Sequence, residues 1–349
     1  MGASSMTQHI LLLGAGFSRN WGGWLADEAF EYLLGHPRID DGLRTLLWRH
    51  KGKGGFEAAV DEQETQTAQK TEGDKALRTS MMGGVVSNTA MLDHAQRLDE
   101  AIRGMFADMN KAFATVNFEF QNSIDYSVRS CLVRFDAIFT LNQDVLMEQH
   151  YLTSSFVAAS RGRWNGWQIP GMEPIPPEGV QPHEMNWVPM DASEFVLREK
   201  CQPYFKLHGS STWIDDRSGR EMLIIGGDKP SAIERHPILK WNREQFRVYL
   251  SKPETRLMVI GYSFRDEHIN NAIGEAAERG SLRLFIIDPD GVDVLDKDYR
   301  KSLFWESSDF RGPLLLRFQN HLIGASRRTL REIFGGDMVE HGKVMRFFA

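Results

Sequence analysis

Short apolar runs, each stopped by glycine or by polar residues, are the feature that most limits how this 349-residue chain can fold. The runs expected to be strands are residues 9–13, 135–141, 204–207, 222–225, 257–260 and 282–287. Runs this short suit buried strands better than helices, and helical patterns lie between several of them. Such alternation is typical of an α/β fold, so we expect a Rossmann-like, mostly parallel sheet with helices on both faces.

The order of these patterns also predicts a division of the chain. Residues 9–64 and 127–300 are expected to form the Rossmann-type domain, with an inserted helical module at residues 65–126. Residues 153–203 are rich in tryptophan and proline, which favours an irregular insertion within the main domain. Residues 301–349 are expected to be a C-terminal extension that contributes to assembly or to a partner contact.

Several helices are expected, including one that begins near Asp266. One follows the first strand, from Trp24 to Leu34, and another covers His321 to Phe334 and ends at a pair of glycines. A further helix carries an apolar seam with alternating spacings of four and three: Met91, Ala95, Leu98, Ile102, Met105, Met109 and Phe113. Packing of this seam on the chain's own core is a commoner arrangement than an oligomer contact, although both fit the pattern.

Composition narrows the function classes. The chain has 41 basic and 47 acidic side chains, a formal net charge of -6, which gives no general attraction to nucleic acid or to an anionic membrane. Its two cysteines, Cys131 and Cys201, are too few for a four-thiolate zinc site or a disulfide framework, so no metal is expected. No apolar stretch reaches the roughly 18 residues of a membrane span, and a secretory signal is not recognisable. A cytoplasmic location is therefore expected.

Candidate site residues come directly after predicted strands. They are the Gly14-Ala15-Gly16 turn, Asn142 with Asp144, His208, Gly261 with Ser263, and Asp288. In a parallel α/β sheet, ligands bind beyond the carboxyl ends of the strands, where these residues should meet. Position 19 is arginine and not the third glycine of the dehydrogenase fingerprint, which disfavours a hydride-transfer enzyme.

Five blocks, taken in order, resemble the NAD-binding blocks of the sirtuin superfamily. They are Gly14-Ala15-Gly16-Phe17-Ser18, Thr140-Leu141-Asn142-Gln143-Asp144, Leu207-His208-Gly209, Gly261-Tyr262-Ser263-Phe264 and Ile287-Asp288. A single block could arise by chance, but five in this order point to the family. The resemblance implies that NAD is the substrate.

The resemblance also implies a role for each block. The residues from Gly14 to Ser18, including Ala15, Gly16 and Phe17, look like the phosphate loop. Asp144 resembles the residue that receives the nicotinamide carboxamide, and Asn142 the residue beside the ribose of the scissile bond. His208 resembles the general base, for which a pKa near neutrality is suited. The family pattern assigns Gly261, Ser263 and Asp288 to cofactor binding, the last two at the adenosine half.

Each of these residues also has a purely structural interpretation. Asn142 and Asp144 could form Asx turns or cap the next helix, and Ser263 could be a helix cap. A single histidine before a glycine, such as His208, is often no more than a satisfied turn residue. The ordered set of blocks favours the functional interpretation, more strongly for Asn142 and His208 than for Ser263 and Asp288.

The departure from the family pattern suggests which activity to expect. Protein-deacylating sirtuins usually carry a zinc ribbon of two Cys-x-x-Cys pairs, and this sequence has none. The chain instead resembles the sirtuin-like effectors of bacterial antiphage defence, which hydrolyse NAD. The leading hypothesis is cleavage of NAD to nicotinamide and ADP-ribose. A non-catalytic subunit that binds NAD or ADP-ribose is the alternative, and an NAD-dependent deacylase is third.

Control of such an activity would require other molecules. An unregulated NAD hydrolase would poison its host, so the resemblance implies control by formation of a homo-oligomer, by a partner such as a HerA-like ATPase, or by a nucleotide signal. Direct binding of nucleic acid or of a membrane is not expected.

Overall fold

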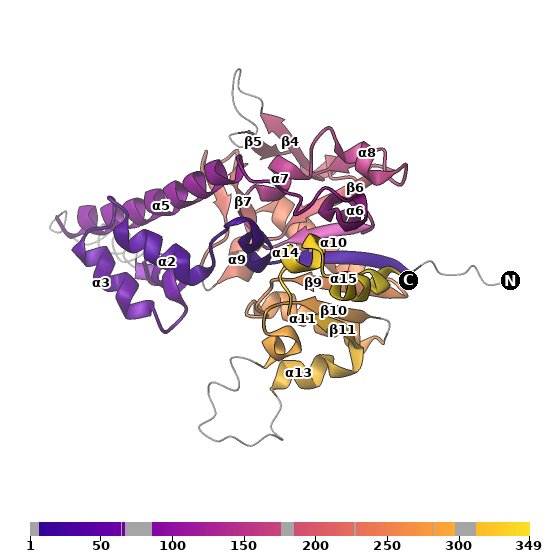
Figure 1. Cartoon of the computed structure of the whole chain (residues 1–349). Helices are drawn as coiled ribbons and strands as arrows, with labels where there is room; N and C mark the ends of the chain where they lie inside the picture. The colour runs from indigo at the N-terminus through magenta and orange to yellow at the C-terminus, as the bar shows by residue number, and fades with distance from the viewer. Residues whose placement is uncertain are drawn as a thin grey trace.

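The computed structural model describes residues 7–63, 65–66, 86–175, 185–226, 228–280, 282–296 and 312–349. Its main sheet contains β1 (Gln8–Leu13), β2 (Ala137–Thr140), β3 (Gly166–Gln168), β6 (Cys201–Lys206), β9 (Thr255–Ile260), β10 (Arg283–Ile287) and β11 (Leu322–Ser326). The strand order is β11-β10-β9-β1-β2-β6-β3, and every neighbouring pair is parallel. The predicted Rossmann-like α/β fold is thus confirmed (Figure 1).

The sheet is buried on both faces, which the continuous apolar runs predicted. Successive side chains of a strand point to opposite faces. Accordingly, Leu11 and Leu13 of β1 belong to one apolar cluster, whereas Ile10 and Leu12 belong to another. The first cluster includes residues of α2, α5 and α14, and the second includes residues of α10, α11 and α13. Helices therefore cover both faces.

The helices are distributed along the whole described chain. Before the second strand they are α1 (Ala15–Ser18), α2 (Ala26–Gly35), α3 (Asp41–His50), residues 55–63, α5 (Val86–Phe113) and α6 (Val128–Leu132). After it come α7 (Leu146–His150), α8 (Phe156–Ser160), α9 (Lys229–Glu234), α10 (Pro237–Leu250), α11 (Glu267–Glu278), α13 (Pro313–Phe318), α14 (Leu330–Gly335) and α15 (Met338–Met345). No helix among the described residues is both long enough and apolar enough to cross a bilayer.

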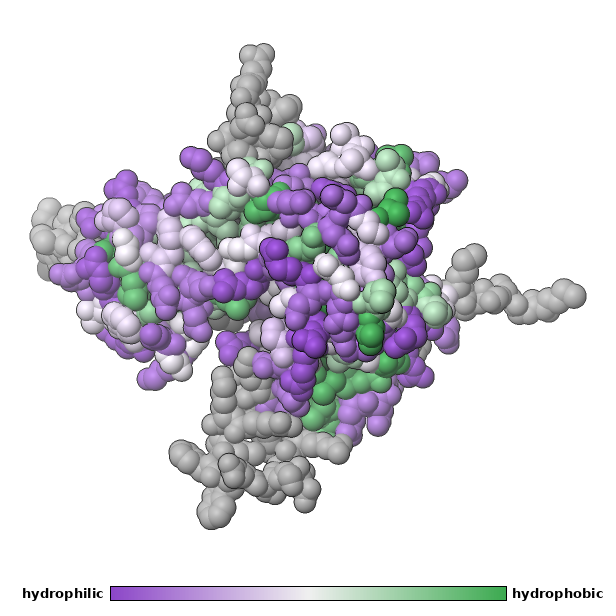
Figure 2. All heavy atoms as spheres, in the orientation of Figure 1, coloured by the Kyte–Doolittle hydropathy of each residue, from purple (hydrophilic) through white to green (hydrophobic). Residues whose placement is uncertain are grey.

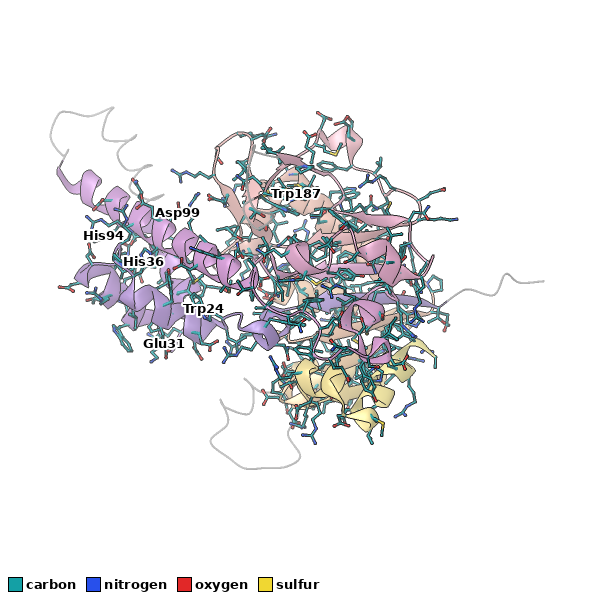
Figure 3. The ribbon with its side chains drawn as sticks, turned by 45° about the horizontal axis from the view of Figure 1, so that its top comes forward. Trp24, Glu31, His36, His94, Asp99 and Trp187 are labelled. Carbon is teal, nitrogen blue, oxygen red and sulfur yellow. The ribbon has the colours of Figure 1, made fainter. Side chains whose placement is uncertain are left out.

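A helical lobe extends to one side of the sheet, where α2 and α3 pack beside α5 (Figure 1). Tyr32 donates a hydrogen bond to Asp108 at 2.6 Å, and Arg38 pairs with Glu100 at 3.0 Å. Figure 3 shows His36, His94 and Asp99 on this lobe, away from Trp187. Helices that precede residue 65 thus share the lobe with α5.

The apolar seam of α5 packs inside its own chain. Its members Leu98, Ile102, Met105, Met109 and Phe113 are buried in the same cluster as the sheet residues. Ala95 is partly exposed, and the side chain of Met91 lies outside the described part of the chain. Packing within the chain therefore explains why these residues are apolar, and no contact with a second protein is needed.

A second, four-stranded sheet lies beside the main one. It contains β4 (Met172–Ile175), β5 (Asn186–Pro189), β7 (Gly209–Ile214) and β8 (Glu221–Leu223), in the order β4-β5-β7-β8. The chain enters this sheet at Gly209. This residue has a φ of +74°, and a Cβ there would lie 1.9 Å from the Met222 carbonyl oxygen, so only glycine fits. The run 222–225, predicted as a strand, therefore contributes to this small sheet at residues 221–223. Parts of the segment 153–203 are also more regular than its prolines predicted, because β3, β4 and β5 find pairing partners at strand edges.

The prediction of one helix from His321 to Phe334 was wrong. Residues Leu322–Ser326 form β11, which pairs in parallel with β10, and only Leu330–Gly335 are helical at the end of that range. The open edge of β10 offers hydrogen-bonding groups that override the local helical pattern. Gly324 allows this pairing because a Cβ there would lie 2.5 Å from the Phe285 ring. The strand at 282–287 is consequently not the last of the sheet.

Candidate functional site

The loops after β1 and β9 touch at the carboxyl edge of the sheet. Gly14 N–H donates to the Ile260 carbonyl at 3.0 Å, and Gly16 N–H donates to the Gly261 carbonyl at 2.9 Å. In the main sheet, β2 lies on one side of β1 and the later strand β9 lies on the other side. The strand order therefore reverses at β1. Such a reversal of strand order is where open α/β sheets bind their ligands.

Close packing of these two loops explains why glycine occupies three positions. A Cβ on Gly14 would lie 2.5 Å from the Gly261 carbonyl oxygen, and one on Gly261 would lie 2.4 Å from Gly16 backbone atoms. Gly261 also has a φ of +63°, which L side chains rarely adopt. The glycines are thus required by the fold itself, in addition to any role toward a phosphate.

Gly261→Ala is expected to lower the free energy of unfolding by clearly more than Gly280→Ala. Both positions have positive φ, so both variants pay the backbone strain of about 1–2 kcal/mol. Of the two, Gly261 alone has backbone atoms in the way, because no atom of the described residues lies within 4 Å of a Cβ at Gly280. Urea denaturation of the two variants measures the difference, and equal losses would show that the loops separate without cost.

The phosphate-loop block is folded as a short helix. Gly14 is the N-cap of α1, and a short 3-10 turn from Arg19 to Trp21 continues it. Ala15 is exposed and Gly16 partly so, whereas Phe17 is buried in the core with its ring centroid 5.1 Å from that of Trp21. Of this block, Ala15 and Gly16 reach the surface, whereas Gly14 and Phe17 are buried.

The Asn142 side chain is held through its amide nitrogen. It lies in the loop after β2 and is 9% exposed. Its Nδ2 donates to the Ser18 Oγ at 2.9 Å, and its backbone N–H donates to the Thr140 Oγ1 at 3.0 Å. Its buried Oδ1 has no hydrogen-bond partner among the described residues. A buried acceptor without a partner costs about 1–3 kcal/mol, so this oxygen is available to a ligand that brings a donor.

The Asp144 side chain stabilises the turn before α7. Its Oδ1 accepts a hydrogen bond from the Leu146 N–H at 3.1 Å, the Asx-turn geometry that precedes α7. Burial raises the pKa of this carboxyl, while the Lys206 ammonium, the Leu146 N–H and the Ser18 hydroxyl oppose that shift. The carboxyl is therefore affected by the same serine that positions Asn142.

Lys206 and Glu148 form a buried pair behind these residues, which the sequence analysis missed. Lys206 is fully buried at the end of β6, and its Nζ donates to the Asp144 carbonyl at 2.5 Å and to Glu148 Oε1 at 2.6 Å. Burial raises the pKa of Glu148, and the ammonium of Lys206 counters it. The available signal was a lysine within the otherwise apolar run 204–207.

His208 lies at the strand end next to that of Asn142. In the β2–β6 pairing Thr140 is opposite Lys206, so Asn142 and His208 are each two residues past the last paired position. The Gln143 side chain donates to the His208 carbonyl at 3.0 Å and ties the two loops together. Burial lowers the pKa of His208 to about 3, with Lys229 and His268 acting in the same direction and Asp266 opposing. The imidazole is therefore neutral, and its pKa is far from the near-neutral value that we expected.

The two residues expected at the adenosine half lie farther out on the same edge. Ser263 is exposed, and it does not cap α11, whose N-cap is Asp266. Asp288 is partly buried, and its Oδ1 accepts a hydrogen bond from the Asp290 N–H at 2.9 Å. The carboxyl of Asp288 thus stabilises its own turn.

A second histidine lies against His208 and was not predicted. The Nε2 atoms of His208 and His268 are 3.2 Å apart. Asp266, two residues before His268, lies close enough that one ligand atom from each of the three residues falls within 4.8 Å of the others. Lys229 pairs with Asp266 at 2.7 Å and with Glu57 at 2.9 Å. These groups form a mixed-charge cluster, here called the His208 cluster.

Comparison with known proteins identifies the family. No curated protein matches the chain. A family model for the SIR2-like domain matches residues 136–311, about half of the chain, including Asn142, His208 and Gly261. SIR2-like domains use NAD as a substrate, so the match places the chain in a family of NAD-dependent enzymes. The chain belongs to the SIR2-like domain family.

Proposed function

We propose that this protein is an NAD⁺ hydrolase that cleaves the nicotinamide–ribose bond to give nicotinamide and ADP-ribose. The observation that carries the proposal is the buried Asn142 Oδ1, which lacks a partner among the described residues. It lies at a strand end adjacent to that of His208, beside the reversal of strand order. A ribose hydroxyl or a water molecule would supply the missing donor.

Few protein groups are needed for this reaction. The bond between C1′ of the ribose and the cationic nicotinamide nitrogen breaks, its electron pair neutralises that nitrogen, and the ribose becomes an oxocarbenium ion. Water then attacks C1′ and releases a proton. In the proposed reaction, Asn142 orients the ribose or the water, and Asp144 faces the carboxamide.

His208 supports the reaction through a hydrogen bond that it accepts. Its neutral imidazole has a lone pair for a ribose hydroxyl or for the attacking water. Because burial weakens it as a base, we expect the ring to stabilise the developing charge by this hydrogen bond and to pass the proton on to solvent.

Product analysis tests the proposal. The purified protein is incubated with NAD, with and without an acyl-lysine peptide, and nicotinamide, ADP-ribose and acyl transfer are quantified by chromatography. Nicotinamide and ADP-ribose without peptide are expected. Turnover that requires the peptide would indicate a deacylase, and calorimetric NAD binding without turnover would indicate a non-catalytic subunit.

We further propose that the protein is a regulated antiphage effector, controlled by self-assembly or by a HerA-like ATPase. Figure 2 shows apolar residues gathered over α13 and β11, at the open edge of the sheet. Leu316 is 52% exposed there and Ile323 is 45% exposed, and exposed apolar residues at a sheet edge favour association. Light scattering, alone and with such an ATPase, is expected to show an assembly, and a monomer under all conditions would contradict this control.

A further inference from the structure

The His208 cluster has the geometry of a cation site. Two imidazoles bound through Nε2 to one tetrahedral Zn²⁺ at about 2.0–2.1 Å have their Nε2 atoms about 3.3 Å apart. The Nε2 atoms of His208 and His268 are 3.2 Å apart, and their ring centroids are 5.2 Å apart. In this structure the two nitrogens share a hydrogen bond, and their separation is the one that two ligands of a single ion would have.

Asp266 supplies the third ligand to the same position. Its carboxylate lies within 4.8 Å of both imidazole nitrogens, so a small rotation brings one oxygen into reach. Its Oδ1 is paired with Lys229, but that ammonium also contacts Glu57 at 2.9 Å. Lys229 therefore keeps its ion pair with Glu57 when Asp266 turns toward a cation.

The charge of the cluster favours a cation as well. Two carboxylates, Asp266 and Glu57, surround a single ammonium, Lys229, which leaves one negative charge uncompensated among these groups. Imidazoles bind metals in their neutral form. Nitrogen and carboxylate ligands together are typical of zinc sites, and three protein ligands leave the fourth position open.

We propose that His208, His268 and Asp266 bind one Zn²⁺ ion, and that zinc at this position blocks the reaction. The second half of the proposal rests on the proposed function. A zinc ion on Nε2 of His208 removes the lone pair that would accept a hydrogen bond from the ribose or from water. Bound zinc would thus keep the enzyme inactive, and loss of the ion would restore turnover.

Zinc binding is tested first, independently of NAD. The full-length protein is stripped with a chelator, dialysed against zinc, and its metal content is measured; Co²⁺ absorption reports the coordination. One zinc per chain with a tetrahedral Co²⁺ spectrum is expected. Asp266→Asn, which preserves shape, and His268→Ala are each expected to weaken binding by at least about tenfold, as even changes beside metal ligands do.

His94→Ala is the matched control. His94 also contacts a carboxylate, with Asp40 at 3.2 Å, but it is not part of a three-ligand group within the described parts of the chain (Figure 3). This variant is expected to bind zinc as the unaltered protein does. Absence of bound zinc, or equal zinc binding by Asp266→Asn, His268→Ala and the unaltered protein, would overturn the site.

The block is then tested with NAD. Turnover by the unaltered protein and by His94→Ala is expected to fall in proportion to zinc occupancy and to return on chelation, while magnesium has no effect. Full turnover by the zinc-loaded protein would reject the block and leave the site standing. Failure of the proposed function gives a different result, because a protein without any turnover would still bind zinc through these three residues.

Discussion

Asn142→Ala and His208→Ala are each expected to reduce NAD turnover by about 10²–10⁴-fold, which corresponds to about 3–5 kcal/mol of transition-state stabilisation. In the proposed reaction both side chains act on the same ribose, so the loss should appear in kcat more than in KM. The fold should persist. Loss of Asn142 removes its hydrogen bond to Ser18, but it also removes a buried oxygen that has no partner among the described residues.

Steady-state kinetics with NAD, together with urea denaturation, separates these effects. Asn165→Ala and His94→Ala are suitable controls, because Asn165 is exposed and His94 lies on the helical lobe. Both controls are expected to keep normal turnover. If Asn142→Ala and His208→Ala also kept normal turnover, the proposed site would be wrong. Reduced turnover that tracks reduced stability would instead point to a structural role.

The central strands of the fold could be predicted because their residues are buried on both faces. β1, β2, β6, β9 and β10 all overlap predicted apolar runs, although β6 and β9 begin two or three residues earlier than predicted. The edge strands β3 and β11 could not be predicted, since an edge strand needs fewer apolar residues and depends on a neighbour far away in the sequence. Leu322 to Ser326 becomes a strand only because β10 has an open edge.

The site was predictable to the extent that strand ends are predictable. Asn142 and His208 follow runs that end at the same edge, so their proximity follows from the parallel pairing of β2 with β6. Ser18 was predicted as part of the phosphate loop, but its hydrogen bond to Asn142 was not. Lys206 and His268 were missed altogether, because their side-chain directions depend on tertiary packing.

Lys206→Met is expected to destabilise the protein by about 3–5 kcal/mol. Lys206 is fully buried and Glu148 nearly so, and removal of the ammonium leaves a buried carboxylate without its cation. The pKa of Glu148, already raised by burial, should rise further. A group whose pKa is raised in the folded state destabilises that state only where it is ionised, so the deficit should be large at about pH 8 and shrink toward about pH 5.

Urea denaturation at both pH values measures the deficit, and Arg328→Met, which removes an exposed arginine from its pair with Glu332, is expected to show no measurable change. Lys206→Met combined with Glu148→Gln should recover the part of the lost stability that comes from the unpaired Glu148 carboxylate, although the buried Asp144 carboxyl still lacks the ammonium. An equal deficit in the double variant would mean that the charge is not its cause.

The double variant also separates stability from positioning. Lys206 donates a hydrogen bond to the Asp144 carbonyl, in the loop that carries Asn142, and methionine cannot replace that bond. If Lys206 orients this loop for the proposed reaction, the double variant should be stable and yet turn over NAD more slowly, with kcat reduced more than KM is changed. Stability and turnover that both return to normal would show that the buried lysine serves the fold alone.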